Sequence, residues 1–216
     1  MTEAKKVEAE RNELLAAHVI KNLEKRNFEA CYCATAKEAV EKIISMISET
    51  ATVSWGGSYS LTDTGLLDSV KQKFSVIDRD TAKTPEERTE LMRKSLCSDV
   101  FLTSFNAVSE DGVVINIDGN GNRVAAITYG PTSVIAMVGM NKISKTQETA
   151  LVRARTVAAP LNVHRFGRKT TGCALTGSCQ DCLSQECICN VIQTLRRNPG
   201  PKGRIKVVLV GEELGF

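Results

Sequence analysis

Helical and strand-like segments alternate along the first half of the chain, and this alternation limits the folds that it can adopt. The helices are expected at 4–27, 36–48 and 85–96, and the strands at 28–33, 51–55, 74–78 and 99–103. Thr35 and Glu38 have the spacing of a capping box at the start of the second helix. Helices and strands that alternate with short connections favour an α/β fold with a largely parallel sheet.

The second half changes to short strand-like runs separated by tight turns. The sequence Asp-Gly-Asn-Gly-Asn at 118–122 is typical of a hairpin, because Asp-Gly and Asn-Gly tolerate positive φ. We therefore expect a late β-meander, with strands at 107–108, 112–118, 123–129 and 133–140. Beyond it we expect a helix at 145–158, a loop-rich segment at 159–187, a helix at 188–197 and a buried strand at 205–210.

Length and charge restrict the class of protein further. The 216 residues suit one domain, 1–216, in which a cysteine-rich loop segment at 160–190 forms an appendage. The 28 basic and 25 acidic residues give a net charge of +3, which does not indicate a nucleic-acid partner. The sequence shows neither an apolar run of membrane-spanning length nor the pattern of a secretory leader. We therefore expect a cytoplasmic protein with no membrane partner.

A turn rich in glycine and serine follows the strand expected at 51–55. Its two glycines allow a ligand to approach the backbone closely, and amides at the start of a helix favour an anion. The turn matches neither the phosphate-binding Walker loop nor the Gly-x-Gly-x-x-Gly dinucleotide fingerprint. A plain tight turn is the alternative interpretation. The residues that we expect to contact a small anionic ligand are Ser54, Trp55, Gly56, Gly57 and Ser58.

Two further segments offer charged candidates. Glu110 lies in the sequence Ser-Glu-Asp-Gly between two strand candidates, where a carboxylate can serve as a base or a nucleophile. The same four residues also suit a simple hairpin turn. Asn162 and Arg165 lie in a basic loop, where Arg165 is a candidate to pair with a carboxylate or phosphate of the ligand. A solvated loop is the alternative there.

Five of the eight cysteines lie between Cys173 and Cys189. Clustered cysteines in a cytosolic protein indicate a metal or redox site, and Cys179 and Cys182 have the Cys-x2-Cys spacing that binds zinc or iron. Four thiolates become available when Cys173 and either Cys187 or Cys189 are added. Free thiols, or disulfides formed on oxidation, are the alternative. Cys31, Cys33 and Cys97 are scattered and are expected to pack as small core residues.

Several stretches spread over nearly the whole chain share the pattern of one known family. They are Ser54–Ser58 with Thr64–Leu66, Tyr129–Pro131 leading into Val134–Ile143, Ala159–Arg165, Gly172–Cys182 and Ile188–Asn190. Through them the chain resembles the LUD-domain family, named for lactate utilization, in a form without the ferredoxin-type domain of larger relatives. Cys173, Cys179, Cys182 and Cys189 fall on the cysteine positions of this family and are the expected metal ligands, whereas Cys187 is an addition of this sequence.

This resemblance implies a fold like that of ribose-5-phosphate isomerase and the coenzyme A transferases: an open, mainly parallel sheet with helices on both faces. It implies a component or accessory of iron–sulfur-dependent lactate utilization, in which L-lactate becomes pyruvate. From the cysteine spacing we expect an iron–sulfur cluster or a zinc ion as the cofactor. The expected partners are other lactate-utilization subunits, and a homo-oligomer is the expected assembly. The alternatives are an independent sugar-phosphate or acyl-CoA enzyme with Glu110 as base or nucleophile, and a ligand-sensing module without chemistry.

Overall fold

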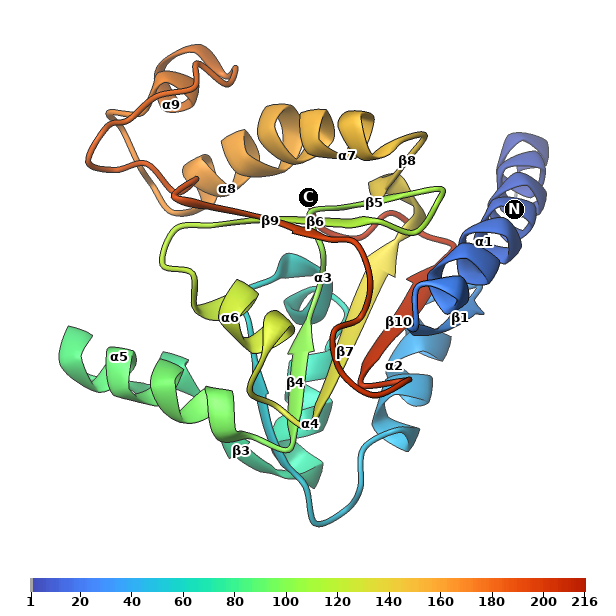
Figure 1. Ribbon diagram of the computed structural model, residues 1–216, viewed down its shortest axis with the longest axis horizontal. Coiled ribbons are helices and arrows are strands. Elements are labelled where there is room, and N and C mark those ends of the chain that lie inside the picture. The colour runs from blue at the N-terminus through green and yellow to red at the C-terminus, as the bar shows by residue number, and fades with distance from the viewer. Residues whose placement is uncertain (1) are drawn as a thin grey trace.

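The main sheet of the computed structural model, which describes residues 2–216, contains six parallel strands in the order β1-β10-β7-β4-β2-β3 (Figure 1). Parallel neighbours need crossover connections, and helices provide most of them. This confirms the expected α/β class and the mainly parallel sheet. The strands are β1 (Glu29–Cys33), β2 (Thr52–Trp55), β3 (Ser75–Ile77), β4 (Val100–Thr103), β7 (Ser133–Gly139) and β10 (Ile205–Val210).

The central strands are apolar on both faces because a hydrophobic core lies on each side of the sheet. In β10, Val207 and Leu209 point into one core, whereas Val208 and Val210 point into the other. Alternate residues of a strand point to opposite faces, so a strand buried on both sides is a continuous apolar run. This explains the β-branched sequence at 205–210.

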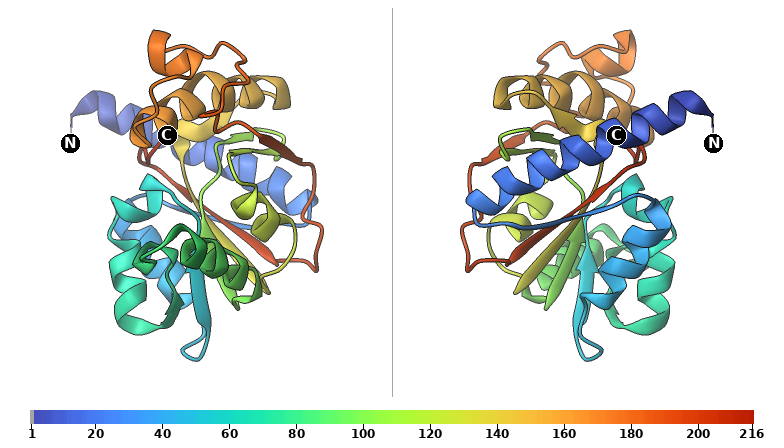
Figure 2. Two further views of the ribbon diagram at one scale, coloured as in Figure 1. Left: turned by 90° about the vertical axis from the view of Figure 1, so that its left-hand side faces the viewer. Right: turned by 90° about the vertical axis from the view of Figure 1, so that its right-hand side faces the viewer.

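Helices cover both faces of the sheet (Figure 2). The longest described helix, α1 (Glu3–Lys25), packs on the first core through Ala16, Val19 and Leu23. The opposite face carries α2 (Ala36–Ser45), α3 (Tyr59–Thr62) and α4 (Leu66–Lys73). The predicted cap is present, since the Glu38 amide donates to Thr35 Oγ1 over 3.2 Å. Among residues 2–216, no helix has both the length and the apolar character needed to cross a membrane.

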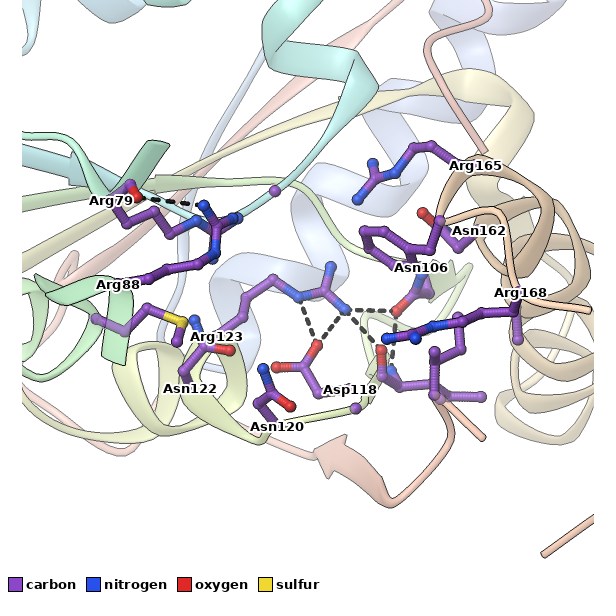
Figure 3. A pocket seen from close by; sticks show the side chains of 17 residues that line it. Arg79, Arg88, Asn106, Asp118, Asn120, Asn122, Arg123, Asn162, Arg165 and Arg168 are labelled. Carbon is purple, nitrogen blue, oxygen red and sulfur yellow. Dashed lines mark hydrogen bonds and ion pairs between the residues drawn. The ribbon is translucent and has the colours of Figure 1, made fainter. Parts of the chain in front are cut away.

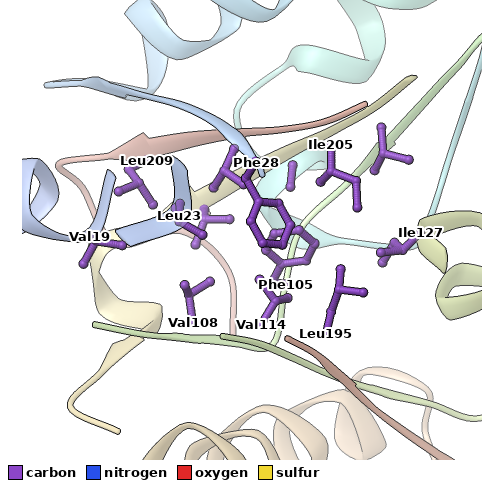
Figure 4. Packing of buried hydrophobic residues seen from close by; sticks show 14 of the residues in the cluster. Val19, Leu23, Phe28, Phe105, Val108, Val114, Ile127, Leu195, Ile205 and Leu209 are labelled. Atoms are coloured by element: carbon purple, nitrogen blue, oxygen red, sulfur yellow. The ribbon is translucent and has the colours of Figure 1, made fainter. Parts of the chain in front are cut away.

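A second sheet of four strands lies over the first core. Its order is β8-β5-β6-β9, with β6 antiparallel to β5 and β9, and with β8 parallel to β5. Phe105, Val108 and Leu195 contribute to the packing between the two sheets (Figure 4). The outer face is covered by α7 (Gln147–Arg153). The strands are β5 (Ala107–Ser109), β6 (Val114–Asp118), β8 (Ile143–Ser144) and β9 (Val191–Leu195).

The strand predicted at 123–129 is wrong, because this segment forms the helix α6 (Asn122–Thr128). The helix begins after Gly121, which has φ +78°, and the amide of Val124 donates to Asp118 Oδ2. The Asp-Gly-Asn-Gly sequence therefore connects a strand to a helix instead of two strands of a hairpin. The next strand, β7, returns to the main sheet.

The helix predicted at 188–197 is also wrong. Val191–Leu195 forms β9, which pairs antiparallel with β6 at the edge of the second sheet. The segment expected to be rich in loops contains two short helices, α8 (Ala159–Arg165) and α9 (Gly172–Thr176). A π-helical turn at Ala154–Ala158 joins α7 to α8. Edge pairing with β6 thus decides the conformation of a short apolar run that sequence alone leaves ambiguous.

Candidate functional site

A cavity of about 330 Å³ lies at the carboxyl ends of β2, β3 and β4, where α8 and the turn after β6 close it (Figure 3). Ligands of open α/β sheets bind at this edge. The lining is dominated by guanidinium groups from separate parts of the chain. They belong to Arg79, Arg88 on α5 (Pro85–Lys94), Arg123 on α6, Arg165 on α8, and Arg168.

Gly57 allows two of these guanidinium groups to reach the backbone. A Cβ atom placed on Gly57 would lie 2.6 Å from Arg79 Nη2 and 3.3 Å from Arg165 Nη2. Both cationic groups therefore occupy the space that a side chain would take. The glycine is needed here for close approach, and the turn after β2 forms one wall of a cationic site.

Arg79 and Arg165 carry charge that the protein itself does not neutralise well. Burial lowers the pKa of Arg79, and the charges of Arg88 and Arg165 lower it further. Its Nε atom is buried and finds no hydrogen-bond acceptor among residues 2–216, with Asp80 3.9 Å away. A buried hydrogen-bond donor without an acceptor is costly. An anionic ligand in the cavity would supply the acceptor that Arg79 Nε lacks.

Arg165 takes part in no ion pair among the described residues. Its guanidinium carbon lies 4.9 Å from the ring centre of Tyr59 and 4.4 Å from that of Phe166. Burial lowers the pKa of Arg165, and Arg123 contributes in the same direction. The two rings hold the group in place and leave its donors available to a ligand.

The carboxylates near the cavity are already paired. Asp118 Oδ1 lies 2.7 Å from Arg123 Nη2, and the two side chains are 8% and 11% exposed. Arg123 also donates to the Asn106 side chain and to two backbone carbonyls, which fixes its position (Figure 3). Asp80 pairs with Arg88 over 2.8 Å. The cavity therefore has a surplus of positive charge.

The structure brings several of the predicted ligand residues together. Gly57, Asn162 and Arg165 line the large cavity. They also line a smaller one of about 20 Å³, to which Ser58 contributes. Asn162 Nδ2 donates to the Ala158 carbonyl within its own helix. The turn at 56–58 and the helix at 159–165 thus meet in space, although about a hundred residues separate them.

The other residues predicted in this turn have different neighbours. Ser54 is buried in β2, and its hydroxyl donates to the Ile77 carbonyl. Trp55 belongs to the core on the opposite face, with Lys71 Nζ 5.4 Å from its ring centre. Gly56 lies beneath Arg123, whose Cδ would be 3.0 Å from a Cβ at that position. Gly56 therefore leaves space for the Arg123 side chain, which lines the cavity.

Lys142 is a functional candidate that sequence reasoning missed. It lies at the end of the 3₁₀ turn Met140–Lys142 after β7 and lines the smaller cavity. Its side chain is buried, and Nζ donates to Ser60 Oγ over 2.8 Å and to Ser104 Oγ over 3.0 Å. Burial is the main cause that lowers its pKa to about 7. Nothing in the local sequence distinguishes it from an exposed lysine.

Glu110 lies on the turn between β5 and β6. Its carboxylate accepts from Lys145 Nζ over 2.6 Å, and its carbonyl accepts from Asn22 on α1. Asp111, the next residue, pairs with Arg26, which directly follows that helix. These contacts fasten the turn to α1 and to the segment after β8, a role that suits the hairpin interpretation.

All five clustered cysteines line a third cavity, of about 70 Å³, close to α8 and α9. They are free thiols, and apolar side chains such as Val163 and Ile192 complete the lining. Hydrogen bonds from the Gly172 and Ser184 amides lower the pKa of Cys182, whereas burial raises that of Cys189 to about 12. Among residues 2–216, no three potential ligands converge as a metal ion requires. A bound metal would therefore require the thiols to move.

Comparisons with known proteins agree on the architecture. A family model described as "LUD domain" matches residues 16–210. A crystal structure of a DUF162 family protein from Deinococcus radiodurans has a TM-score of 0.55 at 13% identity, covering 92% of this chain and 97% of that one. The eIF2B delta structure from Chaetomium thermophilum has a TM-score of 0.33 at 16% identity and covers 64% and 54%, a likeness too low to support an argument. A search of curated proteins gives no match.

Proposed function

Because the chain belongs to the LUD domain family, a family associated with lactate utilization, we propose that it binds a small anionic metabolite between Gly57, Arg79 and Arg165. The observation that carries the proposal is the convergence of these two guanidinium groups on Gly57, with a buried Arg79 Nε that lacks an acceptor. Like charges held together in a partly desolvated site favour a multiply charged or bidentate anion, such as a carboxylate or phosphate.

We propose further that the protein acts as a component or accessory of iron–sulfur-dependent oxidation of L-lactate to pyruvate. Family membership supports this assignment. The cationic cavity supports it as well, because lactate and pyruvate each offer a carboxylate beside an oxygen on the adjacent carbon. In this proposal the thiols of Cys173, Cys179, Cys182 and Cys189 hold an iron–sulfur cluster or zinc ion or contact a redox partner, and Cys187 is not required.

Titration calorimetry with L-lactate, pyruvate and inorganic phosphate tests the anion site. At least one of them is expected to bind, and Arg165→Gln should weaken binding by about tenfold or more, equivalent to about 1.4 kcal/mol. Arg93→Gln is the matched control, because Arg93 is an exposed α5 residue paired with Glu90. Equal affinities of the two variants, or no binding of any of the three anions, would contradict the proposal.

Turnover assays beside these titrations distinguish the alternatives. Binding without turnover, alone or with an added redox partner, would favour a ligand-sensing module. Turnover of a sugar phosphate or acyl-CoA that is lost in Glu110→Gln would favour an independent enzyme that uses Glu110. If turnover is unchanged in Glu110→Gln, that enzyme mechanism is excluded.

A further inference from the structure

Lys142 is a buried amine without an acidic partner. Its side chain is 2% exposed, and the groups that contact Nζ are the hydroxyls of Ser60 and Ser104. Among residues 2–216, no carboxylate forms an ion pair with Lys142. Burial of an unpaired ammonium group is costly, so a structural role alone does not account for a lysine at this position.

The charged groups around Lys142 are cationic. Arg153 on α7 and Arg123 on α6 oppose its protonation, and Arg165 on α8 lines the same small cavity. Arg123 itself pairs with Asp118 over 2.7 Å. Desolvation and these like charges lower the pKa of Lys142 to about 7, so a large share of the amine is neutral and nucleophilic at neutral pH.

The amine lies beside the anion site. The small cavity that Lys142 lines is also lined by Gly57, Ser58 and Arg165, and it shares Gly57, Asn106, Arg123, Asn162 and Arg165 with the large cavity. A ligand of two or three carbons whose carboxylate contacts Arg165 would extend toward the small cavity that the lysine lines. A reactive amine beside a carboxylate-binding arginine suits a 2-oxo acid.

We propose that Lys142 forms an imine with the carbonyl carbon of a small 2-oxo acid that is bound through its carboxylate. The inference rests on the proposed anion site and names its substrate class. In the first step, the Nζ lone pair attacks the carbonyl carbon, the C=O π electrons move to oxygen, and that oxygen takes up the proton that nitrogen loses. The resulting carbinolamine then loses its hydroxyl group, which takes up the remaining N–H proton of Nζ and leaves as water, while the nitrogen lone pair forms the C=N bond.

Ser104 is the group placed to transfer this proton. The Ser60 hydroxyl already donates to the Leu214 carbonyl, whereas Ser104 Oγ has Lys142 as its side-chain partner, 3.0 Å away. Ser104 can therefore donate its proton to the carbonyl oxygen while it accepts one from the nitrogen. Ser104 is a proton-transfer residue in this step, and Arg165 orients the substrate.

Reductive trapping tests the proposal. The protein is incubated at neutral pH with glyoxylate, with pyruvate, or with the neutral probe acetaldehyde, each with cyanoborohydride, which reduces an imine to a stable amine. Peptide mass mapping then locates the adduct. Glyoxylate and pyruvate are expected to label Lys142, with glyoxylate preferred over acetaldehyde by about tenfold or more at equal concentration. Lys142→Met should lose this label, whereas Lys145→Met, the exposed control three residues away, should retain it.

Peptide mass mapping of the labelled wild-type protein tests the proposal even if Lys142→Met folds poorly. Glyoxylate adducts spread over exposed lysines, with Lys142 unmodified, would overturn the proposal, while anion binding by calorimetry could still hold. Equal labelling of Lys142 by glyoxylate and acetaldehyde would overturn the 2-oxo acid assignment and would also count against the anion site. Arg165→Gln should remove the preference for glyoxylate and leave acetaldehyde labelling unchanged, which supports both proposals together.

Discussion

Arg79 and Arg165 direct their guanidinium groups at the same glycine from positions 86 residues apart in the chain, one following β3 and the other on α8. Their Nη2 atoms would lie 2.6 and 3.3 Å from a Cβ at Gly57. Two like charges are stable at such a place only if the fold restrains them, as Asp80 and the Tyr59 and Phe166 rings do here.

Gly57→Ala should weaken anion binding with little effect on stability. Gly57 is not among the glycines with positive φ, so the backbone accepts alanine. The methyl group would displace the flexible end of Arg79, and the anion would lose one of its two guanidinium contacts. We expect an affinity loss of about tenfold by calorimetry, with an unchanged urea midpoint as the control. Unaltered affinity would show that the anion does not bind at this glycine.

Asp118→Asn should destabilise the fold substantially. The Asp118–Arg123 pair is largely buried, and the variant would leave Arg123 uncompensated among the other arginines. Removing one partner of a buried pair costs about 3 kcal/mol of the free energy of unfolding, measured by urea denaturation. Glu90→Gln breaks the exposed Glu90–Arg93 pair and should cost less than about 0.5 kcal/mol. Similar losses in both variants would contradict the structural role assigned to Asp118.

The alternation of helices and strands was readable from sequence because it depends on local periodicity. The two segments whose secondary structure was predicted wrongly lie where tertiary contacts determine the conformation. Residues 123–129 form a helix because Asp118 accepts the Val124 amide, and Val191–Leu195 forms a strand because β6 offers an edge. A short apolar run is compatible with either conformation until such a partner is known.

The candidate site was predictable only in part for a similar reason. Gly57 and Arg165 lie in segments whose composition is unusual, a glycine-serine turn and a basic loop. Arg79 and Arg88 lie in charged segments, where a solvated surface is the usual interpretation. Lys142 is a single lysine that shortly follows the apolar strand β7. The fold places the two arginines at the large cavity and Lys142 at the adjoining small one, and no local pattern signals this long-range arrangement.

Stability should depend on pH through Lys142. Its pKa is about 7 in the folded protein and about 10.4 in an unfolded chain, so the unfolded chain binds more protons between these values. The free energy of unfolding therefore rises with pH above about 7, by at most about 1.4 kcal/mol per pH unit. Below about pH 7 the penalty for burying the charge is fully present.

Urea denaturation of the wild type and Lys142→Met between about pH 6 and pH 9 isolates this effect. The wild type should gain stability relative to the variant as the pH rises through this range. Lys145→Met provides the matched control, since it removes an exposed lysine three residues away. A constant difference for Lys142→Met would contradict the lowered pKa.

Cys182 should be more reactive than Cys189 in protein kept free of metal by a chelator. Donors from Gly172 and Ser184 lower its pKa, whereas burial raises that of Cys189 to about 12. Because the thiolate is the nucleophile, iodoacetamide at neutral pH should label Cys182 faster than Cys189 by about tenfold or more, as measured by peptide mapping. Equal rates would show that these hydrogen bonds do not form in solution.

Anaerobic purification followed by iron, sulfide and zinc analysis tests the metal proposal. The five thiols line one cavity but do not converge on a common point, so metal binding requires a local rearrangement of the segment around α9. We expect stoichiometric iron with sulfide, or zinc. Cys173→Ser, Cys179→Ser, Cys182→Ser and Cys189→Ser should each lose it, because each removes one of four thiolate ligands. Cys187→Ser is the matched control and should retain the metal. Metal-free wild-type protein with all five thiols titratable would exclude the cluster and leave the cavity as a site of free thiols.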